Sequence, residues 1–359
     1  MFRGSTVDTI SLRIRLTLAF LLVAMLGIPG VPSFAETPAT PPAATAPARE
    51  RRPQPLDEVS TIFEQKGVLT PKYSVTFEPS LQTTYLTSNR VALIGYTIVP
   101  AVTIGLIDIR DVDDDMFIAA FAFRFGITNR CELEFKVPYV YRNNSSINTP
   151  LNTPTDVSLY NAEGYGFGDV EATLRYQLNQ PAGPGGIYIA SLRGKARNGK
   201  DPFEVPYIPG ASGGAGAGLP SELPVGSGFY AIQPAITMIF PADPAVVFGT
   251  LNYQWNIERN IEGVGKIDPA DAFGINFGLG IGLNENLSFS LGYDHVVLGT
   301  STLDGNRLGN SKTTQVGTLL LGTSYRLSNR SNMIISLGIG ATAYAPDVQF
   351  TVKVPINFF

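Results

Sequence analysis

A strict alternation of apolar and polar residues, repeated over strand-length segments, constrains the fold of this chain more than any other feature. In residues 169–178 every odd position is polar or charged, and every even position could contact lipid. Because successive side chains on a strand point to opposite faces, such a segment has one apolar and one charged face. A soluble sandwich also hides one face, but here the apolar face recurs in segment after segment and the polar face carries unlike charges that suit a wet interior. The pattern predicts an all-β protein that forms a transmembrane antiparallel up-and-down β-barrel.

The N-terminal residues have the pattern of a cleaved export signal. Arg13 and Arg15 precede an apolar run over residues 16–28, and Ala35 lies in a group of small residues that a signal peptidase recognises. The run is too short to span a bilayer as a helix, which takes roughly 20 residues. An N-terminal membrane anchor is the alternative, but two prolines directly after the run disfavour it. We therefore predict a signal peptide over residues 1–35.

Residues 36–70 are predicted to be a periplasmic tether. The stretch up to residue 55 is dominated by Pro, Ala and Thr, and Arg49, Arg51 and Arg52 stand near its end. A segment of this composition cannot bury enough apolar surface to fold, so we expect it to be disordered. The arginines could touch anionic headgroups, although a solvated linker is the simpler interpretation. The remaining residues, 71–359, form the predicted outer-membrane barrel.

Composition supports export and excludes several classes of protein. The mean hydropathy is +0.11, yet no apolar run has the length of a membrane-spanning helix. A barrel explains both observations, because its apolar residues are spread over every second position. The single cysteine, Cys131, excludes an intrachain disulfide and a cysteine-based metal cluster. The net charge of -4 is spread along the chain, so the sequence has no basic stripe for nucleic acid.

Long polar loops and short turns alternate along the chain. We expect loops over residues 142–164 and 198–226, whereas the turns at residues 128–130, 284–286 and 328–330 are short. Outer-membrane barrels show this asymmetry, with long extracellular loops and short periplasmic turns. If the short turns are periplasmic, both ends of the barrel domain lie in the periplasm and the number of strands is even.

The strand number follows from this parity. About ten alternating strands come from Cys131 onward, so the preceding stretch must supply an even number. Three segments are visible there, over residues 73–86, 91–109 and 116–127. If one of them lies outside the wall, the barrel has 12 strands; if residues 91–109 fold into two strands near Pro100, it has 14. We predict about 12 strands and keep 14 as the alternative.

Several short motifs resemble those of a known family. They are Gly166-Phe167-Gly168-Asp169 before a strand that ends Leu174-Arg175-Tyr176, the turn over residues 125–133, Val137-Pro138-Tyr139, and Ala345-Pro346-Asp347-Val348 followed by Val354-Pro355. Over most of its length after residue 70 the chain is similar in these motifs to the outer-membrane β-barrel transporters of the phenol meta-pathway family (MetA-pathway of phenol degradation). The resemblance implies an exported barrel of the bacterial outer membrane that takes up aromatic or other hydrophobic compounds. The glycine-rich segment at residues 209–219 has no counterpart in this pattern, and we assign it no role.

The C-terminal segment is predicted to be the last strand of the barrel. Its apolar face carries the alternate residues from Phe350 to Phe358, whereas Phe359 is one step out of phase. Outer-membrane barrels commonly end in an aromatic residue that the barrel-assembly machinery recognises. We expect Phe358 to take that role, or the strand to fray at its end. An ordinary strand that happens to end in Phe is the alternative.

Few residues could support catalysis or bind a cofactor. The only histidine, His295, is in phase with Tyr293 and should face lipid or the aromatic rim, whereas Asp294 should face inward. A Ser-His-Asp site needs converging side chains, so we predict no enzyme. The acidic residues 113–115 could bind calcium, but a solvated loop tip is the more common role of such a run. Gly166 and Gly168 are not followed by a helix and do not match a nucleotide-binding motif, so we predict no cofactor.

The inward face of the predicted barrel is the candidate working surface. The lumen-facing candidates are Arg124, Glu132, Glu134, Lys136, Asp169, Glu171, Arg175, Arg193, Lys195, Arg197, Asp294 and Arg326. Facing residues on adjacent strands lie about 5 Å apart and can form ion pairs. Opposed basic and acidic strands could create a transverse field that orients a polar solute. Alternatively, the charges neutralise one another and fill a narrow interior, which we expect for most individual residues in a barrel of this size.

These patterns predict a porin-like protein of the Gram-negative envelope. The leading hypothesis is an outer-membrane channel or transporter for the passive uptake of small molecules, including aromatic or hydrophobic ones. Its expected partners are outer-membrane lipid, the barrel-assembly machinery and the small-molecule solute, with no nucleic acid. The alternative is a non-conducting barrel whose long loops serve surface binding or envelope architecture.

Overall fold

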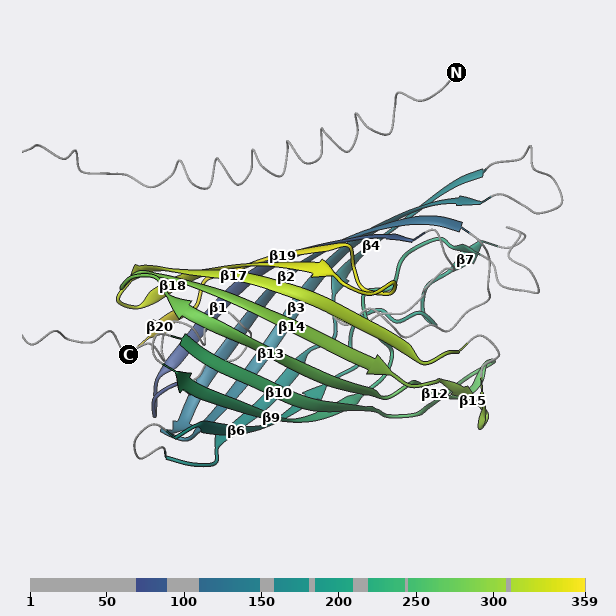
Figure 1. The fold of residues 1–359 in the computed structure, drawn as a ribbon. Coiled ribbons are helices and arrows are strands. Elements are labelled where there is room, and N and C mark those ends of the chain that lie inside the picture. Colours follow the sequence, from purple (N-terminus) through teal and green to yellow (C-terminus); the bar gives the residue numbers. More distant parts are fainter. Residues whose placement is uncertain are drawn as a thin grey trace, which may run out of the picture. The chain divides into compact units, whose positions relative to one another are not determined.

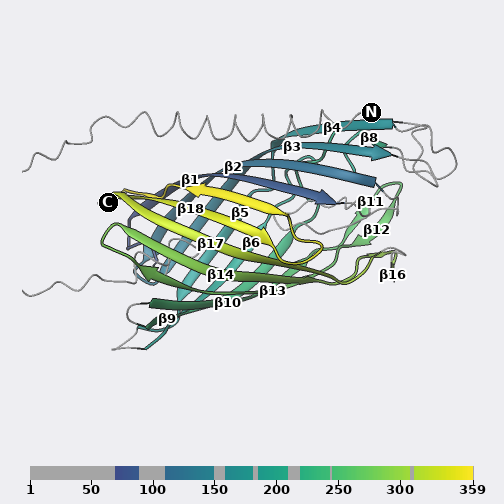
Figure 2. The ribbon, with the colours of Figure 1, turned by 45° about the horizontal axis from the view of Figure 1, so that its top comes forward.

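The described residues of the protein form one closed β-barrel with small sheets in its connections. The structure is a computed structural model that describes residues 69–88, 110–148, 158–180, 185–208, 219–242, 245–307 and 311–358. Each wall strand pairs antiparallel with its neighbours in the sequence, and β1 (Val75–Ser88) closes the cylinder by pairing with the last wall strand. The strands are tilted around the barrel axis, as Figures 1 and 2 show.

The wall contains 12 strands, as the sequence predicts. Two of these strands are interrupted. β4 and β5 together make one wall strand, and both pair with β3; β19 and β20 together make another, and both pair with β1. After β1, the wall elements are β2 (Arg110–Thr128), β3 (Cys131–Asn148), β4 (Ser158–Phe167), β5 (Glu171–Gln177), β6 (Ile187–Lys195), β9 (Ala231–Ala242), β10 (Ala245–Asn256), β13 (Ala272–Gly282), β14 (Leu287–Leu298), β17 (Thr314–Ser328), β18 (Ser331–Gly340), β19 (Val348–Lys353) and β20 (Ile356–Phe358).

The direct pairing of β1 with β2 explains why the barrel has 12 strands and not 14. The two strands are in register from Val75 opposite Phe125 to Ser88 opposite Val112. No further wall strand fits between them, so in the described part of the chain two wall strands precede Cys131. The predicted segment at residues 91–109 lies outside the described residues.

Three expected boundaries are wrong. The acidic residues 113–115 belong to β2 and are not a loop tip. The expected loop over residues 142–164 is mostly strand, because β3 continues to Asn148 and β4 begins at Ser158. Asp169 precedes β5, although the alternation had placed it inside that strand. The first two errors have one cause: beyond the membrane a ladder can continue through polar residues that show no alternation.

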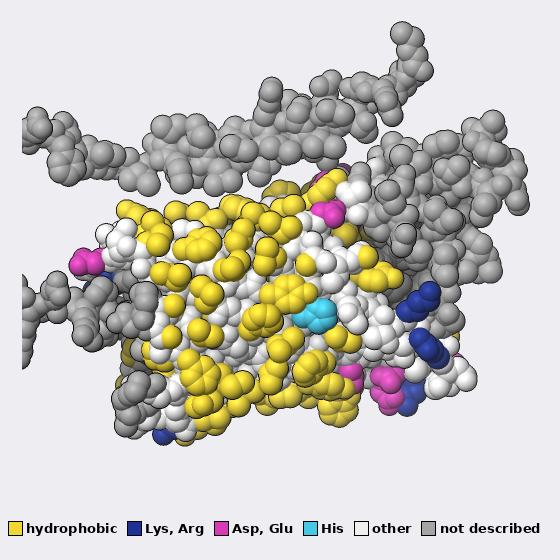
Figure 3. All heavy atoms as spheres, in the orientation of Figure 1, with side chains coloured by type: hydrophobic (Ala, Val, Ile, Leu, Met, Phe, Trp, Pro, Cys, Tyr) yellow, Lys and Arg dark blue, Asp and Glu magenta, His cyan; other side chains and the backbone are white. Residues whose placement is uncertain are grey.

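The outer surface of the barrel is an apolar belt. In β2, Phe121, Phe123 and Phe125 are exposed, whereas the alternate residues Ala120 and Ala122 are buried. Apolar side chains cover the visible face of the wall in the same way (Figure 3). A closed barrel satisfies its backbone hydrogen bonds between strands, so it can present such a belt to lipid. The belt and the fold are those of a barrel in the bacterial outer membrane.

The long connections lie at the barrel end opposite the short turns. Two of them form a small four-stranded sheet from β11 (Arg259–Ile261), β12 (Gly265–Asp268), β15 (Thr302–Leu303) and β16 (Asn306–Arg307). A third contains the short pair β7 (Tyr207–Ile208) and β8 (Leu219–Pro220). By the usual asymmetry of such barrels, this end is extracellular and the end with the short turns is periplasmic. In the described part of the chain, no helix is long and apolar enough to cross a membrane.

Candidate functional site

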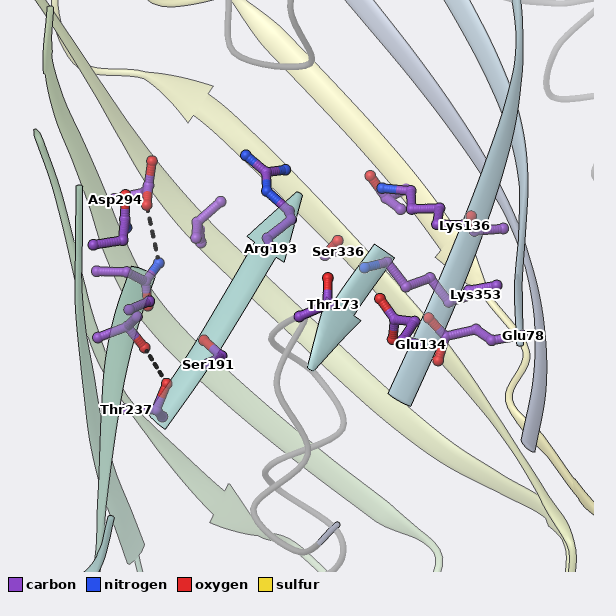
Figure 4. Close-up of a pocket in the computed structure, with 18 of the residues that line it drawn as sticks. Glu78, Glu134, Lys136, Thr173, Ser191, Arg193, Thr237, Asp294, Ser336 and Lys353 are labelled. Carbon is purple, nitrogen blue, oxygen red and sulfur yellow. Dashed lines mark hydrogen bonds between the residues drawn. The ribbon is translucent and has the colours of Figure 1, made fainter. Parts of the chain in front are cut away.

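The barrel encloses a cavity of about 380 Å³ between the two ends of the lumen. Figure 4 shows that the charged side chains of Glu134 and Lys136 enter the cavity from one side. Thr237 and Asp294 enter it from the other side. The lumen-facing residues of β1, β2, β3, β5 and β6 form the ionic wall of the cavity. Those of β9, β10 and β13 carry mostly amide and hydroxyl groups and form the amide wall.

Alternating charges connect neighbouring strands in the ionic wall. Arg124 on β2 lies opposite Glu134 on β3, and its guanidinium contacts the carboxylate of Glu134 at 2.5 Å and that of Glu78 on β1 at 3.0 Å. Arg175 on β5 lies opposite Glu132 and contacts it at 2.8 Å and Glu134 at 3.0 Å. Each carboxylate of this network therefore has a guanidinium partner. The side chains are nearly buried, so each charge depends strongly on its partners.

A second ionic group lies further toward the extracellular end. Arg193 on β6 contacts Glu171 on β5 at 3.2 Å and donates a hydrogen bond to Oε1 of Gln254 on β10 at 3.1 Å. Arg193 thereby links the ionic wall to β10. Lys136 on β3 lies opposite Glu171 in the ladder, and Lys353 of β19 also lines the cavity. Three cations, Arg193, Lys136 and Lys353, and one carboxylate, Glu171, thus line this part of the cavity.

The amide wall is held by hydrogen bonds between polar side chains of neighbouring strands. Gln233 donates to Oδ1 of Asn252 at 2.7 Å, and Asn276 donates to Oδ1 of Asp294 at 3.3 Å. The amides of Gln233, Asn252 and Asn276 both donate and accept hydrogen bonds, so they can solvate a polar solute of either charge. The same side of the cavity also has apolar residues, among them Phe248. The chamber therefore offers hydrogen-bonding groups beside a short apolar surface.

The periplasmic end of the lumen is closed by the segment before β1. Leu69 is only 2% exposed and packs with five lumen-facing residues. These residues are Ile187, Ile189, Ile239, Val246 and Phe248. The backbone N–H of Thr70 donates to Glu132 at 2.7 Å, so the segment is tied to the ionic network. Gly126 permits this path, because a Cβ there would lie 2.0 Å from the carbonyl oxygen of Pro71. Leu69 and Thr70, which the sequence analysis assigned to the tether, are thus buried in the barrel.

The extracellular end is closed by the connection between β6 and β9. Val225 in this connection is buried against Ile118, Ala120 and Val140 of β2 and β3. Ala345, from the connection between β18 and β19, is buried in a similar cluster with residues of β13, β14 and β17. The polar chamber therefore has an apolar closure at each end.

The candidates from the sequence fall into three groups. The first group lines the cavity and consists of Arg124, Glu134, Lys136, Glu171, Arg175, Arg193 and Asp294. Glu132, Asp169 and Lys195 are shielded from solvent in ion pairs and hydrogen bonds beside it. Arg197 and Arg326 are exposed: Arg197 lies beyond the end of β6 with its guanidinium 5.0 Å from the ring centre of Tyr230, and Arg326 lies near the periplasmic turn after β17.

Several cavity residues are missing from that candidate set. Glu78 and Lys353 both line the cavity, and both are in phase with polar neighbours on their strands, so the alternation could have identified them. The amides Gln233, Asn252 and Asn276 follow the same alternation but carry no charge. Leu69 and Val225 had no such signal, because each is an apolar residue in an irregular segment.

The histidine lies away from the cavity. His295 is visible among apolar side chains on the outer surface in Figure 3, and its Nδ1 lies 3.2 Å from the hydroxyl oxygen of Tyr293. Asp294 lines the cavity on the opposite face of the same strand. The two side chains therefore do not form a catalytic pair with each other. Among the residues that the structure describes, no group of three His, Cys, Asp or Glu side chains could hold a metal ion.

Known structures share this fold. No family model matches the chain. The crystal structure of an outer-membrane channel from Pseudomonas putida F1 matches with a TM-score of 0.56 and 12% sequence identity, covering 81% of this chain and 97% of that one. The translocator domain of the autotransporter NalP from Neisseria meningitidis has a TM-score of 0.43 at 8% identity over 83% of this chain and 91% of its own. The NanC porin has a TM-score of 0.40 at 7% identity over 79% and 99%. The first match shows that the fold is that of an outer-membrane β-barrel.

Proposed function

We propose that this protein is a passive channel for small molecules in the bacterial outer membrane. The observation that carries the proposal is the chamber of about 380 Å³, which lies inside a lipid-facing barrel and is lined by ion pairs, amides and hydroxyls. Such a lining replaces part of the hydration of a solute during passage. The similar structure from Pseudomonas putida F1 is an outer-membrane channel, which favours the same activity here. Because fold alone does not determine function, the argument depends on the chamber.

The chamber favours small solutes with one polar group and an apolar body. Arg124 and Arg193 are paired with carboxylates within the walls, which lowers the net field that a solute meets, and amides such as Asn252 can hydrogen bond to the solute. Phe248, Val246 and Leu320 provide apolar contacts in the same chamber. Aromatic compounds with a hydroxyl or carbonyl group fit this combination, and the family resemblance of the sequence motifs implies aromatic or other hydrophobic solutes. We therefore propose such compounds as the solute class.

A non-conducting barrel is the second candidate function. The observation in its favour is the apolar closure at each end of the lumen, which Leu69 and Val225 form in this structure. A channel with these closures must move both of them before a solute can pass from one end of the lumen to the other. The two functions therefore differ in whether the closures open.

Removal of the Leu69 side chain tests the proposal directly. We expect wild-type protein to open rarely in planar bilayers and Leu69→Ala to open more often, because the substitution removes most of the apolar contact that closes the periplasmic end. Single-channel recording measures the open probability. Tyr73→Ala is the matched control, because Tyr73 lies in the same segment but is 72% exposed. If neither wild type nor Leu69→Ala opens at any voltage, the barrel is non-conducting.

A further inference from the structure

Three of the cations that line the chamber are more exposed than the carboxylates beside them. The carboxylates of the ionic wall that line the cavity are at most 8% exposed; they are Glu78, Glu134 and Glu171. The side chain of Arg193 is 25% exposed, and Lys136 and Lys353 are half-buried. We call these three residues the lumen cations. Because all of them line the cavity, a solute that enters the chamber meets positive charge before it meets the carboxylates.

The lumen cations extend into the same chamber. Figure 4 shows Lys136 and Lys353 entering the cavity from one side, with Arg193 pointing into it from β6. Only β1 and β2 separate β19, which carries Lys353, from β3, which carries Lys136. Neighbouring strands lie about 4.8 Å apart, so these two strands are about 14 Å apart, and two extended lysine side chains can approach one ligand from both. The lumen-facing residues between them are small; they are Ser80, Ala120 and Ala122.

Arg193 has hydrogen-bond donors left for a solute. Its guanidinium donates to Glu171 at 3.2 Å and to Gln254 at 3.1 Å. A guanidinium carries more N–H donors than these contacts use, so in the described part of the chain Arg193 keeps donors for a ligand. A carboxylate accepts such N–H groups in pairs, and ammonium groups add further charge-assisted hydrogen bonds. The lumen cations therefore match the chemistry of a carboxylate.

The opposite side of the chamber suits an apolar body and repels a carboxylate. Leu320 on β17 is half-buried and lines the cavity, as does Phe248 on β10. Asp294 also lines the cavity, and its strand β14 lies across the barrel from β3 in the strand order. Because like charges repel, an anionic group is disfavoured near Asp294 and favoured at the lumen cations. A solute with a carboxylate at one end and an apolar body at the other therefore has one preferred orientation.

We propose that Lys136, Lys353 and Arg193 bind the carboxylate of an organic acid that has an apolar body, such as an arylcarboxylate, during its passage through the chamber. The proposal rests on the channel function proposed above and narrows its solute class to anions. Uncharged aromatic compounds and inorganic cations lack the group that the lumen cations recognise. The site should also make the open channel anion-selective, because charges exposed in a pore determine which ions enter it.

Current recordings in planar bilayers test this site. The full chain with Leu69→Ala is the parent, because this substitution is expected to raise the open probability. Its anion-to-cation permeability ratio is obtained from the reversal potential in a potassium chloride gradient. The decrease of the ion current is then titrated with three compounds. These are benzoate, benzamide, which has the ring without the charge, and acetate, which has the charge without the ring.

Further variants of this parent identify the residues. Lys136→Gln combined with Lys353→Gln removes two charges, whereas Lys136→Arg combined with Lys353→Arg keeps them. Lys353→Gln alone is a milder neutralisation for the case in which the double variant does not fold. Lys266→Gln is the matched control, because the Lys266 side chain is 54% exposed and its strand β12 lies in a connection outside the chamber. The difference in gel migration between unheated and heated samples checks the folding of each variant.

The proposal predicts an anion-selective parent in which benzoate lowers the current at a concentration about tenfold or more below those of benzamide and acetate. Double neutralisation should weaken benzoate binding about tenfold or more and lower the permeability ratio, since charge-assisted hydrogen bonds are lost. Lys353→Gln alone should cause a smaller change in the same direction. The arginine pair and Lys266→Gln should behave like the parent.

Two results would overturn the proposal while the channel function stands. One is a benzoate effect equal to that of benzamide or acetate in a conducting parent. The other is unchanged benzoate binding in a folded variant that has lost the lysine charges. If neither the parent nor any variant conducts, the channel function itself fails, and the binding site falls with it.

Discussion

Arg124 is the residue on which the ionic wall depends most. Its guanidinium contacts Glu78 and Glu134 on the two neighbouring strands, and all three side chains are almost fully shielded from solvent. Such a network does not by itself make a protein more stable than well-packed apolar residues would. The loss of one member is different, because it leaves charged groups without a partner.

Arg124→Ala should therefore destabilise the barrel strongly. It removes the cation that contacts Glu78 and leaves Glu134 with Arg175 alone, and breaking a buried pair in this way costs about 3–5 kcal/mol. The measurement is the temperature at which the folded form converts to the unfolded form on detergent gels. Lys312→Ala, at an exposed position in the β14–β17 connection, is the control and should leave that temperature unchanged. Equal conversion temperatures for the two variants would show that the Arg124 network contributes nothing.

Residues 69–71 form a segment with its own specific contacts to the barrel interior, although it has no regular secondary structure. Leu69 fills the apolar cluster at the periplasmic end, and Thr70 binds Glu132 through its backbone. The segment crosses β2 at Gly126, where only a glycine leaves space for the Pro71 carbonyl. A change on the wall can therefore displace the closure without touching Leu69.

Gly126→Ala should open the periplasmic end. The new Cβ would overlap the Pro71 carbonyl, so the segment must move and the bond between Thr70 and Glu132 should break. We expect a higher open probability in planar bilayers, in the same direction as for Leu69→Ala. Gly185→Ala is the control, because no atom lies within 4 Å of a Cβ at that glycine. An unchanged open probability in Gly126→Ala would mean that the segment does not close the lumen.

The C-terminal strand closes the barrel and is also its proposed contact with the assembly machinery. Phe358 lies opposite Val75 in the pairing of β20 with β1 and is exposed on the outer face. Phe358→Ala should reduce the fraction of protein that reaches the folded state in cells, because a lipid-facing aromatic at the closing strand is lost. The proportion of folded protein is measured in outer-membrane preparations from the difference in gel migration between unheated and heated samples. Phe289→Ala, an outward aromatic on β14, is the control, and an equal loss in both would argue against a special role for the last strand.

At the scale of the whole molecule, the alternation in the sequence accounts for the wall but not for its closures. In β3, polar residues alternate with apolar ones at Glu132, Glu134 and Lys136. This alternation was sufficient to predict that the strand has two distinct faces. The buried positions of Leu69 and Val225 could not be predicted, because single apolar residues in irregular segments have no periodicity.

The central claim is that alternate side chains face lipid and a wet chamber, and a pair of adjacent residues on β10 tests it. Leu251 is exposed on the outer face and Asn252 lines the cavity. With a spin label at a single cysteine in the Cys131→Ser background, electron paramagnetic resonance can compare collisions with oxygen, which enriches in lipid, and with a water-soluble nickel complex. We predict that the label at residue 251 collides mainly with oxygen and the label at residue 252 mainly with nickel. Labels that report the same environment at both positions, or a label at residue 251 that neither reagent reaches, would contradict the account.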